Sequence, residues 1–386
     1  GYAREEAAGI PRDHEKRNYK DPNHKPEIMC AISEFWGLCG FRPVSAIRED
    51  FRMLAGLSRD STATSFFAAM AATGSMGSAG ASADLADDAG YLRTLTETVL
   101  AKGDWCPAVC AELVRIAAGQ EEDRFRFLLE ASRYYPGDAG LLFLVILHLV
   151  RLEPGQALFI PAGVLHAYLR GYGVELMANS DNVLRGGLTP KHIDVPELLA
   201  NLDVAATGTR FNPDARAIRI DYPPMCEEFA LTRLNGGGRD TPVDLPPSAV
   251  PLIAICTSGT ARWRMGDGMV QPMGQGESLY IRPGASSLSL SLDGEVYLAS
   301  VPLGDDPDDL FAGIDGGGTS TRVCLMDSRG RVLGAGKAGP SSIDTVTTAV
   351  TEASIRSAME TAFRNFVDDT PCLLYTSPSP RDRGNH

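Results

Sequence analysis

The sequence predicts a mainly β protein with two jelly-roll barrels, an α-helical insertion and a partial α/β segment at the C-terminal end. Three observations predict this fold class. A turn–strand–turn motif occurs twice, at 155–166 and 276–287, helical periodicity fills much of 43–135, and a glycine-rich turn between two strands follows residue 310. Because 386 residues exceed one ordinary domain, we expect two or three domains.

The composition is typical of a folded protein in reducing surroundings. Hydrophobic residues make up 44% of the chain and charged residues 22%, which excludes wholesale disorder. Lys and Arg number 36 against 49 Asp and Glu, so the net charge is -13, which disfavours nucleic acid or an anionic membrane as the main partner. The longest apolar run falls far short of the roughly 20 residues that span a bilayer. The eight cysteines show no disulfide framework, and we expect a cytoplasmic protein.

The first 42 residues are polar at the start and then rich in turns. Asp21-Pro22-Asn23 and the stretch 37–43 interrupt any long helix. The family resemblance given below implies that 1–42 is the end of the first barrel's strand region and carries a Glu metal ligand.

Residues 43–135 predict an insertion of several helices. One predicted helix has Asp104 as its N-cap and ends near Gly119. Its apolar stripe comprises Trp105, Val109, Leu113 and Ile116. The stretch 71–90 is rich in Gly, Ala and Ser, which favours a flexible surface loop. We expect this insertion to pack against the rest of the protein and to carry no chemistry.

The repeated motif predicts two related β units. From Leu144 onward, short strands alternate with Gly and Pro, and each copy of the motif has a turn, an apolar strand and a second turn at a Gly. We place the first barrel at 136–200 and the second at 201–303. Because the first copy ends in His166 and the second in Ser287, we expect only the first barrel to hold a metal.

A hairpin is predicted directly after the second copy. Leucines alternate from Leu288 to Leu292, an Asp293-Gly294 turn follows, and the alternation resumes at Val296.

The first copy fits Gly-x-x-x-x-Ile-Pro-x-Gly-x-x-His and resembles the second metal-binding motif of the cupin superfamily. Longer segments resemble the type I mannose-6-phosphate isomerases, and this likeness runs in order from about residue 10 to residue 302. The segments that carry it are Tyr19–Glu27, Leu38–Pro43, His166–Leu169 and Gly173–Lys191.

The resemblance implies a zinc site made by a Gln, two His and a Glu. Onto this sequence it carries Glu27 and His166 as metal ligands. In the family the other two ligands lie on a Gln-x-His strand before the first of these segments, but residues 1–18 contain no Gln, and their one His is His14. We therefore expect an N-terminally truncated chain, with one zinc site that is incomplete because zinc normally takes three or four ligands.

The resemblance also implies a reaction, the interconversion of mannose 6-phosphate and fructose 6-phosphate through an enediol. A metal polarises the sugar oxygens, and a base must reach the C2–H. The implied catalytic residues are His24 for ring opening, Lys25 or Asp181 for proton transfer, and Arg185 for the enediolate. The identity of the base stays open, and we expect the chain as given to be inactive.

Substrate-binding roles follow from the same segments. Lys191 is expected to hold the 6-phosphate and Glu175 to position sugar hydroxyls. Each residue also has a simpler interpretation: Glu175 as a structural carboxylate, Asp181 as a turn residue, and Lys191 as a solvated charge.

The region 310–368, after an acidic linker at 305–309, shows a different pattern. Phe311 to Thr321 resembles the first phosphate loop of actin-like ATPases and sugar kinases, especially the N-acetylglucosamine kinase and BadF-type branch. In such a loop, Asp315 would face Mg²⁺, while Gly317 and Thr319 would contact phosphates. The alternative is a glycine-rich hairpin in a small β unit. We expect ATP and Mg²⁺ only for a complete domain and no kinase activity from this chain.

The tail 373–386 resembles translated adaptor sequence, and we expect it to be non-native. Two alternative functions remain open: a non-catalytic cupin that binds a sugar phosphate, and a bifunctional isomerase and N-acetylhexosamine kinase in a longer protein. The partner in every case is a small sugar phosphate, and the oligomeric state stays open.

Overall fold

The computed structural model describes most of the chain. The described residues are 1–12, 14, 17–72, 81–238, 241–245, 250–265, 268–282, 288–302, 310–327, 332–342, 346–365 and 375–376. They belong to two compact units, Gly1–Asn212 and Pro213–His386. The linker predicted at 305–309 and most of the tail lie outside the described residues.

Two antiparallel sheets form the β part of the first unit. Their strands are β1 (Glu27–Ala31), β2 (Phe35–Phe41), β3 (Leu147–Leu152), β4 (Ala157–Ile160), β5 (His166–Arg170), β6 (Gly173–Met177) and β7 (Thr209–Phe211). One sheet has the order β6-β1-β4-β7 and the other β3-β2-β5. The central strands β1 and β2 are buried along their whole length, so each sheet is organised around a strand that precedes the helical insertion.

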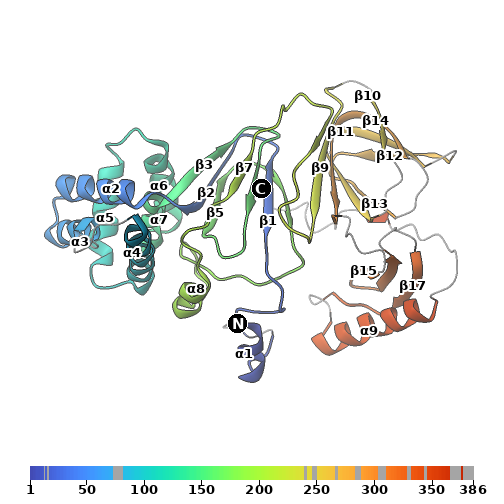
Figure 1. Cartoon of the computed structure of the whole chain (residues 1–386), viewed down its shortest axis with the longest axis horizontal. Helices are drawn as coiled ribbons and strands as arrows, with labels where there is room; N and C mark the ends of the chain where they lie inside the picture. The colour runs from blue at the N-terminus through green and yellow to red at the C-terminus, as the bar shows by residue number, and fades with distance from the viewer. Residues whose placement is uncertain are drawn as a thin grey trace. The chain divides into compact units, whose positions relative to one another are not determined.

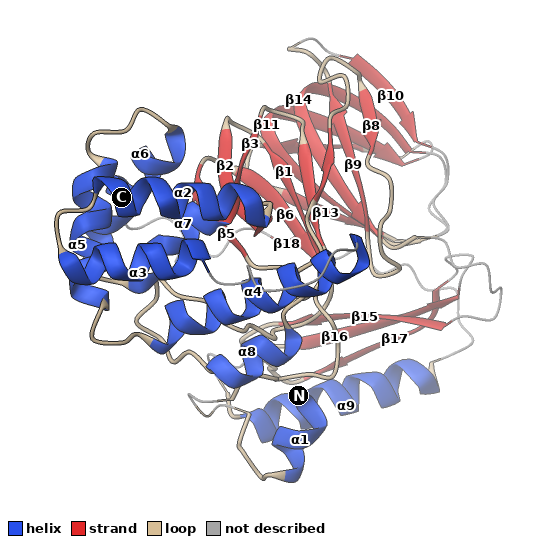
Figure 2. Ribbon diagram, turned by 60° about the vertical axis from the view of Figure 1, so that its left-hand side comes forward, coloured by secondary structure: helices blue, strands red, loops and turns tan. Residues whose placement is uncertain are grey.

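Helices make up the rest of the first unit, and α2 to α7 gather beside the sheet that contains β2, β3 and β5 (Figures 1 and 2). The helices are α1 (Tyr2–Ala7), α2 (Val44–Leu57), α3 (Ser61–Ala72), α4 (Ala81–Ala101), α5 (Cys106–Ala117), α6 (Asp123–Tyr134), the 3-10 helix η1 (Ala139–Leu142), α7 (Phe143–Ile146) and α8 (Val195–Asn201). One hydrophobic cluster joins Trp36 and Leu38 of β2 to Phe51 and Leu113 of the helices. Burial of this shared apolar surface holds the helices to the sheet.

Three local predictions in this unit are wrong. Helix α4 begins at Ala81, inside the stretch predicted as a loop, because alanine favours a helix; residues 73–80 lie outside the described part. Helix α5 begins at Cys106, with Trp105 rather than Asp104 at the N-cap position. Residues 143–146 are helical where a strand was expected, since a buried apolar run does not by itself distinguish helix from strand.

The second unit contains an eight-stranded antiparallel sheet. Its strands are β8 (Arg219–Asp221), β9 (Ala230–Asn235), β10 (Thr241–Leu245), β11 (Leu252–Met265), β12 (Val270–Gly274), β13 (Ser278–Ile281), β14 (Leu288–Ser300) and β18 (Tyr375–Thr376). Strands β11 and β14 pair from Leu252–Ser300 to Met265–Leu288, and Trp263 and Leu290 lie in the core.

The predicted Asp293-Gly294 hairpin is absent, because β14 continues through these residues. Gly294 lies opposite Gly259 of β11, and both have positive φ angles. A Cβ on Gly259 would lie 1.9 Å from the Asp293 carbonyl oxygen. The two glycines therefore allow a close crossing of two long strands instead of a turn.

The C-terminal part of the second unit is a three-stranded sheet with one helix: β15 (Leu310–Gly316), β16 (Thr321–Asp327), β17 (Val332–Ala338) and α9 (Thr348–Arg364). A Cβ on Gly336 would lie 1.9 Å from the Ala358 carbonyl oxygen, so glycine lets the helix backbone rest directly on the strand.

No helix in the described part of the chain is long and apolar enough to cross a membrane.

Candidate active site

Glu27 and His166 meet at the centre of the site. Glu27 is the first residue of β1 and His166 the first of β5, so the two residues come from different sheets of the same unit. The Glu27 Oε2 and His166 Nε2 atoms are 3.2 Å apart. The predicted ligand pair is therefore brought together by strands that are almost 140 residues apart in sequence.

The backbone fixes the orientation of the His166 ring. His166 Nδ1 donates a hydrogen bond to the Val164 carbonyl oxygen over 2.9 Å. In the neutral ring this bond leaves the Nε2 lone pair facing Glu27, the arrangement found for metal-binding histidines. Gly163, with φ at 86°, forms the turn before Val164, and a Cβ there would lie 2.8 Å from the Asn201 carbonyl oxygen.

Lys25 places a positive charge on the other side of the carboxylate. Its Nζ lies 3.3 Å from Glu27 Oε1. Burial tends to raise the pKa of Glu27, but His166 and Lys25 outweigh it, and the net pKa is lowered. Burial tends to lower the pKa of His166, but the Glu27 hydrogen bond and the Val164 carbonyl outweigh it, and the net pKa is raised. The site thus favours an ionised carboxylate next to a basic imidazole.

Glu27 and His166 fit part of a zinc site. Two ligands at zinc distances of 2.0–2.1 Å in a tetrahedron lie about 3.4 Å apart, close to the observed 3.2 Å. However, the described residues contain no group of three or more His, Cys, Asp and Glu side chains placed to hold a metal. Two ligands are fewer than the three or four that zinc normally takes.

Tyr168 connects this pair to Glu175, and the sequence analysis assigned it no role. Its hydroxyl donates to Glu175 Oε1 over 2.8 Å and lies 3.4 Å from Glu27 Oε2. Burial, and then the negative charge of Glu175, raise the pKa of Tyr168, so the hydroxyl stays protonated as a donor. The alternation along β5, which places His166 and Tyr168 on one face, is the sequence signal that would have found it.

A cavity of about 580 Å³ contains the Glu27–His166 pair, and we call it the Glu27 cavity. His24, Lys25 and Glu175 also line it. Asp181 and Lys191 do not line it, and both side chains are exposed.

Asn182, the neighbour of Asp181, holds two loops together. Its Oδ1 accepts hydrogen bonds from the Lys20 and Asp21 backbone N–H groups (2.8 and 3.3 Å). Its Nδ2 donates to the Asp21 and Asn23 carbonyl oxygens (3.0 and 2.9 Å). We call this set of bonds the Asn182 clasp, and it joins the loop before Lys25 to the loop before Arg185.

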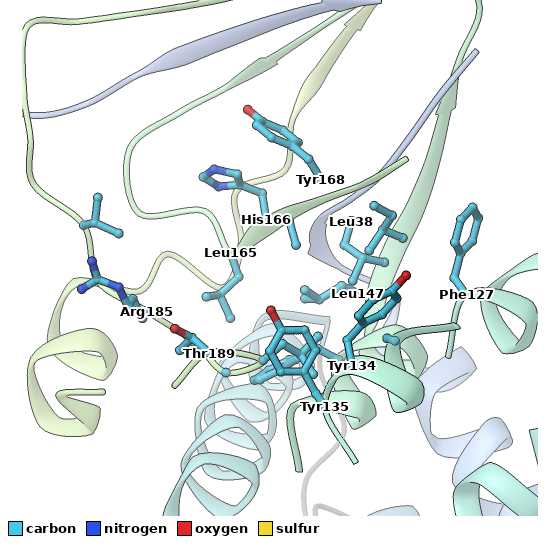
Figure 3. A pocket seen from close by; sticks show the side chains of 18 of the residues that line it. Leu38, Phe127, Tyr134, Tyr135, Leu147, Leu165, His166, Tyr168, Arg185 and Thr189 are labelled. Carbon is cyan, nitrogen blue, oxygen red and sulfur yellow. The ribbon is translucent and has the colours of Figure 1, made fainter. Parts of the chain in front are cut away.

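Arg185 lines a second cavity of about 510 Å³ in the same unit, which we call the Tyr135 cavity (Figure 3). Residues 164–166 and 183–184 line both cavities, so the two share a wall that includes His166. The Tyr135 cavity is bordered on another side by Tyr134 and Tyr135 at the end of α6.

Comparison with known proteins identifies the family. The family model described as phosphomannose isomerase type I, catalytic domain, matches residues 3–44. Mannose-6-phosphate isomerase of Escherichia coli (strain K12) is 33% identical over 300 residues, which cover 77% of this chain and 71% of that protein. The chain belongs to the mannose-6-phosphate isomerase family.

Other relatives agree. The human mannose-6-phosphate isomerase is 37% identical over 219 residues, 55% of this chain and 48% of that protein. A solved structure of mannose 6-phosphate isomerase with zinc bound has a TM-score of 0.66 at 32% identity, covering 78% of this chain and 72% of that one. The Salmonella typhimurium structure bound to fructose 6-phosphate and zinc has a TM-score of 0.65. The family resemblance and the fold class predicted from sequence are confirmed.

The C-terminal part matches a second family model, described as the BadF/BadG/BcrA/BcrD ATPase family, over 312–369. Its glycine-rich turn is compact: the Gly317 N–H donates to the Ser320 carbonyl oxygen (3.0 Å), and the Gly317 carbonyl oxygen accepts from the Ser341 N–H (3.0 Å). Asp315 lies at the end of β15 and Thr319 is exposed in the turn. Their roles toward a nucleotide stay predictions.

Proposed function

We propose that the first unit of this chain binds mannose 6-phosphate and fructose 6-phosphate and is built to interconvert them through an enediol. The observation that carries the proposal is the convergence of Glu27 Oε2 and His166 Nε2, 3.2 Å apart, in a cavity that also contains Lys25 and His24. Membership of the mannose-6-phosphate isomerase family supports the same substrates.

Zinc, when bound, supplies a Lewis acid that polarises the carbonyl and hydroxyl oxygens of the sugar. Glu27 and His166 are the residues of this chain that would hold it. The tautomer fixed by the Val164 carbonyl keeps the His166 Nε2 lone pair available for that purpose.

Proton transfer falls to residues of the Glu27 cavity. Lys25 lines the cavity and Asp181 does not, which favours Lys25 for moving the proton at C2. The contact with Glu27 fixes the position of Lys25 Nζ, which takes the C2 proton as a neutral amine and returns it to C1 as the ammonium. His24, at the exposed edge of the cavity, is placed to give a proton to the ring oxygen when the sugar opens.

Three further residues complete the assignment. Glu175, fixed by the Tyr168 hydroxyl, positions sugar hydroxyls. Arg185, which follows Val183 and Leu184 of the shared wall in the chain and lines the Tyr135 cavity, stabilises the enediolate as a permanent cation. Lys191 meets the 6-phosphate, and it follows the lining residue Thr189, whose Oγ1 accepts the Lys191 backbone N–H (3.2 Å).

An isomerase assay with mannose 6-phosphate tests the proposal. The chain alone should show little turnover, because two ligands hold zinc weakly. A chimaera in which a Gln-x-His strand from a relative precedes the chain should turn over with zinc and stop when zinc is chelated. If that chimaera binds mannose 6-phosphate without turnover, the isomerase proposal fails in favour of a non-catalytic binding protein.

The cellular setting is part of the same proposal. We infer a cytoplasmic protein whose partner is a small sugar phosphate. Support comes from the seven cysteines in the described part of the chain, all of which are free thiols. ATP and Mg²⁺ enter only for a complete C-terminal domain.

A further inference from the structure

The end of helix α6 contributes two tyrosines to a cavity next to the site. Tyr134 and Tyr135 line the Tyr135 cavity together with Arg185 and Thr189. Figure 3 shows Thr189 next to the Tyr135 ring, with Arg185 beyond Thr189 and the Tyr134 ring on the side of Leu147 and Phe127. His166 and Tyr168 lie farther in. The helical insertion therefore reaches the neighbourhood of the Glu27–His166 pair.

Three polar side chains of this cavity form no hydrogen bond or ion pair within the described part of the chain, whereas Glu130, which also lines it, pairs with Arg170. In the described part of the chain, neither tyrosine hydroxyl has a hydrogen-bond partner, and the half-buried Arg185 forms no ion pair. Most of the remaining lining is apolar, including Phe127, Leu147 and Leu188. An unpaired guanidinium beside apolar surface is costly to desolvate, and an anionic ligand removes that cost.

Tyr134 is also placed for a ligand rather than for packing. Its side chain is 75% exposed although it is large and aromatic, whereas Phe127, two turns earlier on the same helix, is buried in the core. Aromatic rings with a free hydroxyl combine apolar contact with a hydrogen bond, which suits the carbon skeleton and oxygens of a sugar.

The geometry points to Tyr134 and Tyr135 as specificity-determining residues that recognise the phosphate-bearing half of the sugar. This inference rests on the proposed function. A sugar whose C1–C2 end lies at the Glu27–His166 pair passes the shared wall at His166 and enters the Tyr135 cavity. There the two hydroxyls donate to phosphate oxygens. The insertion thus selects phosphorylated over free sugars, beyond its role in packing.

Calorimetric titration of the full chain with mannose 6-phosphate, and separately with mannose, tests this inference. The double variant Tyr134→Phe, Tyr135→Phe keeps both rings and removes both hydroxyls. It should bind mannose 6-phosphate about tenfold or more weakly, as two hydrogen bonds to a charged group predict, and its affinity for mannose should not change. Tyr172→Phe, a 79% exposed tyrosine outside both cavities, is the matched control and should behave as the parent chain.

The outcomes separate the two proposals. If the parent chain binds mannose 6-phosphate and the double variant binds it equally well, the role of the tyrosines is refuted and the proposed function stands. Equal losses for mannose and mannose 6-phosphate would also refute it, because the hydroxyls would then not read the phosphate. If the parent chain does not bind mannose 6-phosphate, both proposals fall. The exposed positions tolerate phenylalanine, and matching thermal unfolding curves verify that each variant is folded.

Discussion

The described parts of the two motif copies share a first turn and a short strand, but they lie beside different interiors. Gly155 and Gly276 both have φ near 80°, and each precedes a four-residue strand, β4 or β13. In the first unit the motif leads to His166 and its contact with Glu27. In the second unit the interior is closed by apolar side chains such as Trp263 and Leu290. The comparison teaches that the same turn and strand can border a cavity that contains polar side chains in one unit and an apolar core in the other.

The largest effect that would test this comparison comes from the second unit. Trp263→Ala removes a side chain that is 2% exposed and should lower the free energy of unfolding by about 3–5 kcal/mol. Calorimetric unfolding should show this loss while zinc affinity stays unchanged. A change in zinc affinity would contradict the view that the core around Trp263 takes no part in the zinc site.

The converse substitution is His166→Ala in the first unit. It removes one of two ligands and should weaken zinc binding by about 100-fold or more, with only a small change in thermal stability. Competition with a chromophoric chelator measures the affinity. His148→Ala, on the exposed face of β3, is the control; zinc binding that survives in His166→Ala would exclude His166 as a ligand.

A smaller effect tests the hydrogen bond between Tyr168 and Glu175 in the first unit. Tyr168→Phe removes the 2.8 Å bond to Glu175 and should weaken mannose 6-phosphate binding about three- to tenfold. Titration calorimetry at neutral pH measures it. Unchanged affinity would show that Glu175 keeps its position without Tyr168.

The smallest effect concerns a carboxylate with a purely structural contact. Glu112 of α5 accepts hydrogen bonds from Arg115 (2.7 and 2.9 Å), and this interaction lowers the Glu112 pKa to about 2. The folded pKa is below the unfolded value, so the contribution to stability is complete above about pH 4.5 and is lost as the pH falls toward 2. Glu112→Gln should flatten the dependence of Tm on pH in that window, without altering ligand binding. A Tm that follows the parent curve would contradict the assignment.

Site residues could be predicted from the sequence where nearby turn residues determine their position. Glu27 and His166 begin strands, and local turn residues such as Gly163 determine where those strands start. Asp181 and Lys191 lie in loops whose paths depend on distant contacts, and the sequence alone did not show that they miss the Glu27 cavity.

The fold shows the same difference between local features, which the sequence predicts, and contacts between distant segments, which it does not. The helical stripe around Leu113 is local and was predicted. The close approach of Gly259 and Gly294 joins residues of separate strands, and the sequence pattern at Gly294 predicted a turn instead. The tyrosines of α6 were missed for a related reason. Nothing in their helix indicates that its end reaches the wall formed by His166.

The Asn182 clasp has an evolutionary consequence. It fastens the loop that precedes Lys25 to the loop that precedes Arg185 through several hydrogen bonds from one amide group. A mutation at position 182 would remove these bonds together and so loosen both loops at once. Because these partners are backbone atoms, we expect position 182 to vary less across relatives than positions 20 and 23.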